Sequence, residues 1–302
     1  MNGTSGVGYR TVGLLLALLG VLSFSIRPVL VKVAYAYARD PVTLLALRMV
    51  FSLPFFAVAA WWLERSGPAT PISTRDKWAI VGLGIIGYYL ASFFDYLSLQ
   101  YITAGLSRLI HFTYPTVVVV LGMFFLHKTP RMMEVLALIL TYAGLAVMLL
   151  STVEGQHEFL ALGAAMSFGS AVSYAVYLFV GTQVIQRVGS MRFAAYALLV
   201  SSFCCILQFF VLRPLDALRI PAEVYWISFV IATVSTVLPI FAIAEALKRL
   251  GANTVAIMGA LGPVSAMVLG YLGLEEIMTG RQIFGAALVV LGVVLVTLRP
   301  AR

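Results

Sequence analysis

The chain has 302 residues, of which 62% are hydrophobic and only 11% are charged, and its mean hydropathy is +1.01. A soluble protein of this length would need a far more charged surface, so the composition excludes a soluble globular domain. The net charge of +8 would suggest a nucleic-acid partner only in a soluble protein. We therefore expect no nucleic-acid binding and attribute the charge to membrane topology.

The apolar residues fall into runs of about 20, the length of a helix that crosses about 30 Å of hydrocarbon. They predict an all-α integral membrane protein with ten transmembrane helices, at residues 12–36, 42–63, 77–98, 102–126, 132–151, 159–182, 191–212, 223–246, 252–274 and 280–298. The first run follows Arg10 and is too long for the apolar part of a signal peptide, so we expect a retained helix.

Lysine and arginine residues gather in alternate loops. With the N-terminus in the cytoplasm, twelve of the twenty lie in inner segments and five in outer ones. The other three, Arg27, Arg48 and Arg108, lie within the predicted helices. Because positively charged loops stay in the cytoplasm, both termini are predicted to be cytoplasmic.

The second half of the chain repeats the first. Residues 99–150 match residues 247–298 at a constant offset of 148. The matches include residues that constrain the backbone, namely Pro115 with Pro263, Gly122 with Gly270, and Gly144 with Gly292. Five helices per half is an odd number, so the second half is predicted to be inverted, and His127-Lys128 indeed matches the oppositely charged Glu275-Glu276. We predict two five-helix repeats, 1–151 and 152–302, an arrangement typical of transporters.

Five ionisable residues lie inside predicted helices of the first half: Arg27, Arg48, Asp95, Arg108 and His111. A charge at a helix centre costs about 2.5–3.5 kcal/mol, so each needs a reason. Counting about 1.5 Å per residue from the helix ends places all five in the outer half of the membrane. A salt bridge between Asp95 and Arg108 is the plainest hypothesis, and it leaves Arg27 and Arg48 without an obvious carboxylate.

Two explanations remain open for these two arginines. The planar guanidinium group suits a carboxylate or phosphate, so Arg27 and Arg48 could bind an anionic or zwitterionic substrate. The alternative is hydrogen bonding to backbone carbonyls at broken helices, or snorkelling. His111 shares a helix face with Arg108 and Pro115, and a lone histidine there is more typical of a satisfied interior donor than of a proton carrier.

Two predicted helices carry polar and aromatic residues along one face. In helix 77–98 these are Tyr88, Ser92 and Asp95, and in helix 159–182 they are Ser167, Ser170, Tyr174 and Tyr177. Such faces either line a pathway or join helices by hydrogen bonds. Three prolines, Pro115, Pro239 and Pro263, are predicted to kink their helices and to act as hinges or gates. Glu245 is expected to pair with Lys248 or Arg249.

The sequence has no Walker A motif, no HExxH and no nucleophile elbow. We therefore expect no enzyme activity, no metal and no cofactor, and an energy source other than ATP.

Two matched runs carry a resemblance to a known family. They are LQYITAGLSRLIHFTYPTVVVVLG (99–122) and LKRLGANTVAIMGALGPVSAMVLG (247–270). With ten helices and an inverted repeat, they resemble the EamA-type branch of the drug/metabolite transporter superfamily. The resemblance implies two inverted bundles around a central cavity, and bacterial members that export amino acids, related metabolites or toxic compounds at the inner membrane.

The sequence thus predicts a multi-pass inner-membrane exporter of small, carboxylated metabolites such as amino acids, acting by alternating access as a monomer or homodimer in the lipid bilayer. Arg27, Arg48 and Arg108 would bind a carboxylate, Asp95 and His111 would tune the site, and Tyr88, Tyr174 and Tyr177 would pack the organic part. The alternatives are efflux of cationic drugs, for which a buried carboxylate is expected, and proton-coupled metabolite uptake. A non-transporting membrane protein is a further class, which the repeat argues against.

Overall fold

The structure is a computed structural model that describes residues 3–65, 71–127, 132–153, 159–250 and 261–297, together with Val255, Met258 and Gly259. Every regular element in these residues is a helix, as expected. In chain order the elements are α1 (Gly3–Ser25), α2 (Arg27–Tyr35), α3 (Pro41–Arg65), α4 (Thr74–Gly84), η1 (Ile85–Leu90), α5 (Ala91–Ser98), α6 (Ala104–His111), α7 (Tyr114–Leu126), α8 (Met132–Val153), α9 (Leu160–Val188), α10 (Ser190–Leu212), η2 (Leu215–Leu218), α11 (Ala222–Ala232), η3 (Thr233–Val237), α12 (Leu238–Leu250), α14 (Leu261–Leu274) and α15 (Gly280–Thr297).

Eight stretches of the described chain are long and apolar enough to cross a membrane: Gly8–Tyr35, Pro41–Arg65, Thr74–Ser98, Ala104–Phe125, Met132–Leu150, Leu160–Val188, Ser190–Leu212 and Ala222–Leu247. Two shorter apolar helices follow, Leu261–Leu274 and Gly280–Leu295. The expected ninth helix, 252–274, begins among residues that lie outside the described part of the chain. Lys128, one of the predicted inner-loop charges, also lies outside it. Ten crossings therefore stay a prediction.

Prolines interrupt two of these stretches. Pro28 and Pro115 have no backbone N–H, so neither can bond the carbonyl four residues earlier, and the helix breaks there. The chain turns at Ile26 between α1 and α2, and again between α6 and α7. Arg27 and His111 consequently sit directly at helix breaks, where backbone groups are less completely paired than in a continuous helix.

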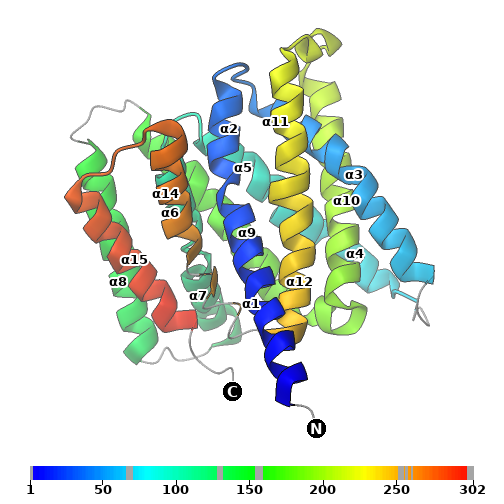
Figure 1. Ribbon diagram of the computed structural model, residues 1–302, viewed down its shortest axis with the longest axis horizontal. Helices are drawn as coiled ribbons and strands as arrows, with labels where there is room; N and C mark the ends of the chain where they lie inside the picture. Colours follow the sequence, from blue (N-terminus) through cyan, green and yellow to red (C-terminus); the bar gives the residue numbers. More distant parts are fainter. Residues whose placement is uncertain are drawn as a thin grey trace.

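Helices from the two halves of the chain pack against each other. Figure 1 shows α8 beside α15 at one edge of the molecule and α3 beside α10 at the other, and α1 likewise packs on α12 and α5 on α9. Glycines allow the closest contact, because a Cβ on Gly144 would lie 2.5 Å from the carbonyl oxygen of Gly285. A Cβ on Gly292 would lie 2.7 Å from the carbonyl oxygen of Ala137.

Two helices from different halves end in the same unusual backbone conformation. His127 follows α7 with φ 48° and Glu275 follows α14 with φ 54°, and these are the two non-glycine residues with positive φ in the described chain. They are 148 residues apart, the offset of the sequence repeat. In Figure 1, α1 begins and α15 ends toward the same end of the bundle, the lower one in that view.

Candidate functional site

An ion pair lies at the break between α1 and α2. Arg27 Nη2 is 3.3 Å from Asp95 Oδ2, with the two side chains 13% and 4% exposed. The geometry of this approach is too poor for a hydrogen bond, since Arg27 Nε and Asp95 Oδ2 are both buried without a partner in the described structure. The predicted Asp95–Arg108 salt bridge is therefore wrong. Equal depth in the membrane does not determine which helix faces meet, and the turn before α2 brings Arg27 to the carboxylate instead.

Arg48 is buried in α3, only 2% exposed, and no carboxylate pairs with it among the described residues. Its Nη2 donates to Ser92 Oγ at 3.0 Å, and its guanidinium carbon lies 5.2 Å from the centre of the Tyr96 ring. Its Nε and Nη1 have no hydrogen-bond partner in the described part of the chain. A buried cation with two unused donors is expensive unless something else satisfies it.

Arg108 lies on α6, where Arg27, Asp95, Tyr114 and Tyr174 are close enough to act on it electrostatically. It is partly buried and forms no ion pair within the described residues. Asp95 is therefore the one carboxylate shown to interact with this group of three arginines in the described residues, through its ion pair with Arg27 and its electrostatic effect on Arg108. The cluster carries a net positive charge inside the apolar part of the bundle.

Serine hydroxyls tie Asp95 to α6 and α9. Ser107 Oγ lies 3.4 Å from Asp95 Oδ1, 3.1 Å from Ser98 Oγ and 3.4 Å from Ser167 Oγ. Ser167 Oγ in turn donates to the Ser107 carbonyl at 2.9 Å. This network holds the carboxylate in place without supplying a second counter-charge.

His111 is held by a hydrogen bond whose direction can be deduced. Ser170 Oγ donates its single proton to the Ala91 carbonyl at 2.7 Å, so at its 3.1 Å contact with His111 Nδ1 it must accept. The proton of the neutral imidazole is thus assigned to Nδ1, which leaves Nε2 as an acceptor. The sequence-based view of His111 as a satisfied interior donor describes Nδ1 well.

The predicted tyrosines gather next to His111. Tyr88 and Tyr177 have their hydroxyl oxygens 3.2 Å apart, and the rings of Tyr174 and Tyr177 stack at 5.7 Å. The Tyr174 ring lies 5.6 Å from His111 and 5.0 Å from Tyr114. This aromatic group, Tyr88, Tyr114, Tyr174 and Tyr177, adjoins the arginine cluster through Arg108.

Two residues of the site were missed from the sequence. Tyr114 lies three residues after His111, and Tyr96 lies four residues after Ser92, so helical spacing could have found both. The structure places Pro115 at the start of α7 and Pro239 after η3 at the start of α12. Pro263 lies within α14, and none of the three prolines belongs to the cluster. Whether they act as hinges stays a prediction.

Charged pairs at the two ends of the bundle have much better hydrogen-bond geometry than the interior Arg27–Asp95 pair. Arg192 binds Glu64 through two hydrogen bonds of 2.7 Å, and Arg249 Nε lies 2.8 Å from Glu245 Oε1, which confirms the expected pairing of Glu245 with Arg249. The Lys248 side chain lies outside the described part.

At the opposite end Arg213 binds Asp40 with bonds of 2.8 and 2.9 Å. Partial burial alone would raise the pKa of Asp40, but hydrogen bonds from Arg213 and Thr43 outweigh it and hold that pKa below its usual value. The same contact raises the pKa of Arg213.

Comparison with known proteins places the chain among transporters. The EamA-like transporter family matches it twice, at residues 11–150 and 161–298. The uncharacterized transporter YcbK of Bacillus subtilis is 24% identical and covers 93% of this chain and 91% of its own length. The uncharacterized transporter sll1319 of Synechocystis is also 24% identical, covering 94% and 92%.

A third relative is named for its substrates. The threonine/homoserine exporter RhtA of Salmonella typhimurium is 28% identical over 65% of this chain and 63% of its own length. A solved crystal structure of a protein aligns with a TM-score of 0.63 at 19% identity, covering 96% of this chain and 97% of that one, which shows a shared fold. The family and these relatives are transporters and not enzymes. The chain belongs to the EamA-like transporter family of the drug/metabolite transporter superfamily.

Proposed function

We propose that the protein exports small carboxylated metabolites, amino acids foremost, by alternating access without ATP hydrolysis. The observation that carries this proposal is the Arg48 guanidinium, which is 2% exposed and has two unused donors and no carboxylate partner in the described structure. An arginine in this state is a ready partner for a carboxylate, which accepts two parallel N–H bonds. The net positive charge of the cluster favours an anionic group over a cationic one.

Each part of the site matches one part of an amino acid. Arg48 and Arg108 would bind the carboxylate, while Asp95, whose Oδ2 has no hydrogen-bond donor, would attract the ammonium group away from its loose pair with Arg27. Tyr88, Tyr174 and Tyr177 would pack against the side chain. The cationic-drug alternative requires a free buried carboxylate, whereas Asp95 already lies 3.3 Å from Arg27 in a cluster that contains three arginines.

We further propose that the chain crosses a bacterial inner membrane ten times as two inverted repeats, 1–151 and 152–302, with both ends on the cytoplasmic side. Three observations support this. The family matches the chain twice, and the matched positions His127 and Glu275 share a rare backbone conformation.

The third observation is an exchange of contacts. The offset of 148 converts Gly144 into Gly292 and Ala137 into Gly285, and the contact of Gly144 with Gly285 has its counterpart in that of Gly292 with Ala137. A pseudo-two-fold axis between α8 and α15 produces such an exchange. The two bundles would rock about the site, with Pro115, Pro239 and Pro263 at the points where helices can bend.

Transport by purified protein in liposomes tests the function. Vesicles loaded with L-threonine or L-homoserine, the compounds for which the RhtA relative is named, should exchange them for external label, and Arg48→Gln should reduce the initial rate at least 10-fold. Arg219→Gln is the matched control, because Arg219 is 85% exposed at the bundle end. Exchange of cationic dyes but of no carboxylated compound would overturn the proposal.

The same assay separates the roles of charge and shape. Arg48→Lys keeps the charge and loses the planar pair of donors, so it should recover only part of the rate. Growth of an overexpressing strain on toxic amino-acid analogues gives the direction, since export predicts resistance and uptake predicts hypersensitivity. A wild-type rate in Arg48→Gln would remove the proposed carboxylate site.

A further inference from the structure

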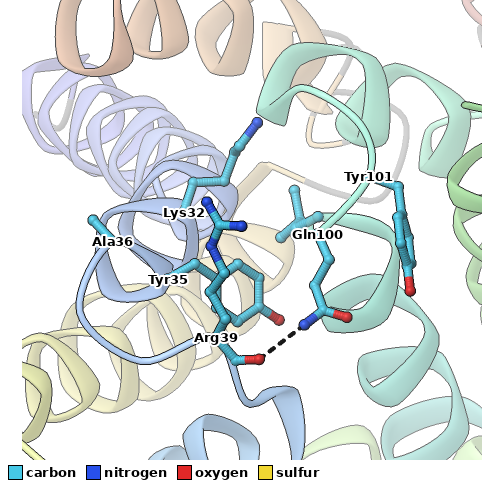
Figure 2. A pocket seen from close by; sticks show the side chains of 7 residues that line it. Lys32, Tyr35, Ala36, Arg39, Gln100 and Tyr101 are labelled. Carbon is cyan, nitrogen blue, oxygen red and sulfur yellow. Dashed lines mark hydrogen bonds between the residues drawn. The ribbon is translucent and has the colours of Figure 1, made fainter. Parts of the chain in front are cut away.

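A cavity of about 480 Å³ opens at the end of the bundle where α2 ends and α6 begins. It is lined by Lys32, Tyr35, Ala36, Arg39, Leu99, Gln100 and Tyr101 (Figure 2). None of these residues belongs to the arginine cluster described above. The volume lies within the range of small-molecule sites.

The charges around the cavity leave one cation available. Lys32 Nζ is 2.9 Å from Glu276 Oε1 and donates to the Ile102 carbonyl at 3.1 Å, so its charge is neutralised. The neighbouring Asp40 is bound by Arg213. Arg39 has no ion pair within the described residues, and only its backbone is bound, through its carbonyl, by Gln100 Nε2 at 3.0 Å (Figure 2).

One residue of the cavity wall, Tyr35, is hydrogen-bonded to a residue next to the arginine cluster. Tyr35, which is 6% exposed, donates its hydroxyl proton to the Tyr96 carbonyl at 2.7 Å. Tyr96 carries the ring that lies beneath Arg48. Leu99 follows Asp95 by one helical turn, about 6 Å along the axis. Tyr35 therefore links the cavity wall to the backbone of the residue whose ring contacts the Arg48 guanidinium.

We propose that this cavity is a second, outer binding site for a small carboxylate, with Arg39 as its cation and Gln100 as a neutral hydrogen-bonding partner. The inference rests on the proposed export function, in which a carboxylate that leaves the buried arginines passes Tyr35 and occupies the cavity before release. A surplus positive charge in a concave site raises the local concentration of anions, which favours a carboxylate as the ligand.

The relative rates at which anionic and cationic reagents label a thiol report the electrostatic potential in the cavity. In a background with Cys204→Ser and Cys205→Ala, Ala36→Cys would place a thiol on the cavity wall, and Ala222→Cys on α11 serves as an exposed control. Purified full-length protein is labelled with an anionic sulfonatoethyl and a cationic trimethylammonioethyl methanethiosulfonate. The anionic-to-cationic rate ratio should be about three-fold higher at position 36 than at position 222, and Arg39→Gln should remove the difference.

Protection identifies the ligand class. Acetate and glycine should slow labelling at position 36 while ethylammonium at equal ionic strength should not, and Arg39→Gln should abolish that protection. An unchanged rate ratio in Arg39→Gln, or no protection by either carboxylate, would overturn the proposal. An unaltered thermal unfolding transition in detergent shows that the variants are folded.

The outcome is separable from that of the transport assay. If Arg48→Gln abolishes exchange while acetate and glycine give no protection, the export function stands and the outer site fails. If protection is present but no carboxylated compound is transported, the outer anion site stands and the export function fails.

Discussion

The buried arginine cluster and the ion pairs at the two ends of the bundle use the same residue types in opposite ways. At the ends, Arg192 with Glu64 and Arg213 with Asp40 form paired bonds of 2.7 to 2.9 Å. In the interior, Arg27 approaches Asp95 at 3.3 Å without a hydrogen bond, and Arg48 has no carboxylate at all in the described structure. Water can solvate an imperfect pair at the surface, whereas hydrocarbon cannot. The best pairs therefore occur where they matter least for stability, and this contrast is what supports the proposal that the interior charges bind a ligand.

The largest expected effect comes from removing the unpaired interior charge. Arg48→Met should reduce transport at least 10-fold and leave thermal stability unchanged or higher, because replacing a buried charge by an apolar side chain of similar volume removes a desolvation penalty. Initial exchange rates and thermal unfolding in detergent measure the two effects. A marked loss of stability in Arg48→Met would show that the cluster is structural.

A smaller effect is expected beside the cluster. Ser170→Ala removes the acceptor that assigns the proton of His111 to Nδ1, so the histidine can adopt the other tautomer and Nε2 no longer acts reliably as an acceptor. If Nε2 faces the substrate, the KM for transport should rise about five-fold, equivalent to about 1 kcal/mol. Transport kinetics with Ser201→Ala on α10 as the matched serine control provide the measurement. A change in maximum rate alone would contradict a role in binding.

The Glu64–Arg192 pair at one end of the bundle should affect stability and not transport. Glu64→Gln and Arg192→Gln should each lower the free energy of unfolding, with a coupling of about 0.5–1 kcal/mol in a double-mutant cycle, as is typical of partly exposed pairs. Glu64 also accepts a bond of 2.7 Å from the Tyr196 hydroxyl, so Tyr196→Phe tests the remaining part of that network. If either charge variant lost transport as Arg48→Gln is expected to, the contrast between the two regions would disappear.

The smallest effect concerns Asp40. Its pKa is held below the usual value, so the stabilisation from its pair with Arg213 is present above the unfolded-state pKa of about 3.9 and is lost as the pH falls through the lower folded-state pKa. Thermal stability should therefore fall below about pH 4, by about 0.5 kcal/mol for this partly exposed pair. Asp40→Asn should lack that component of the pH dependence. An identical acid profile in the variant would show that other carboxylates account for it.

Much of the fold could be predicted because membrane helices are encoded locally. A run of about 20 apolar residues predicts a helix wherever it occurs, and the prolines predicted irregularities that the structure shows beside Pro115 and Pro239. The aromatic stripe of Tyr174 and Tyr177 was found from helical spacing in the same way. Glu245 and Arg249 are four residues apart on one helix, and their pairing followed from that spacing.

The pairing of the interior charges could not be predicted in this way. Sequence spacing suggested that Asp95 pairs with Arg108, whereas the structure pairs it with Arg27. Which of them meet depends on how α2, α5 and α6 are rotated about their axes, and that is determined by packing between distant segments.

The sequence by itself determined that this chain is a helical membrane protein of a transporter family, because apolar run length, helix-breaking prolines and matched positions are properties of the chain alone. Only the tertiary structure decided that Asp95 pairs with Arg27, that Arg48 is left with the Ser92 hydroxyl and the Tyr96 ring, and that Tyr35 and Arg39 line a cavity. The physical reason is that a side chain's charge is written in the sequence, whereas its partner is set by helix rotation and packing between residues far apart in the chain.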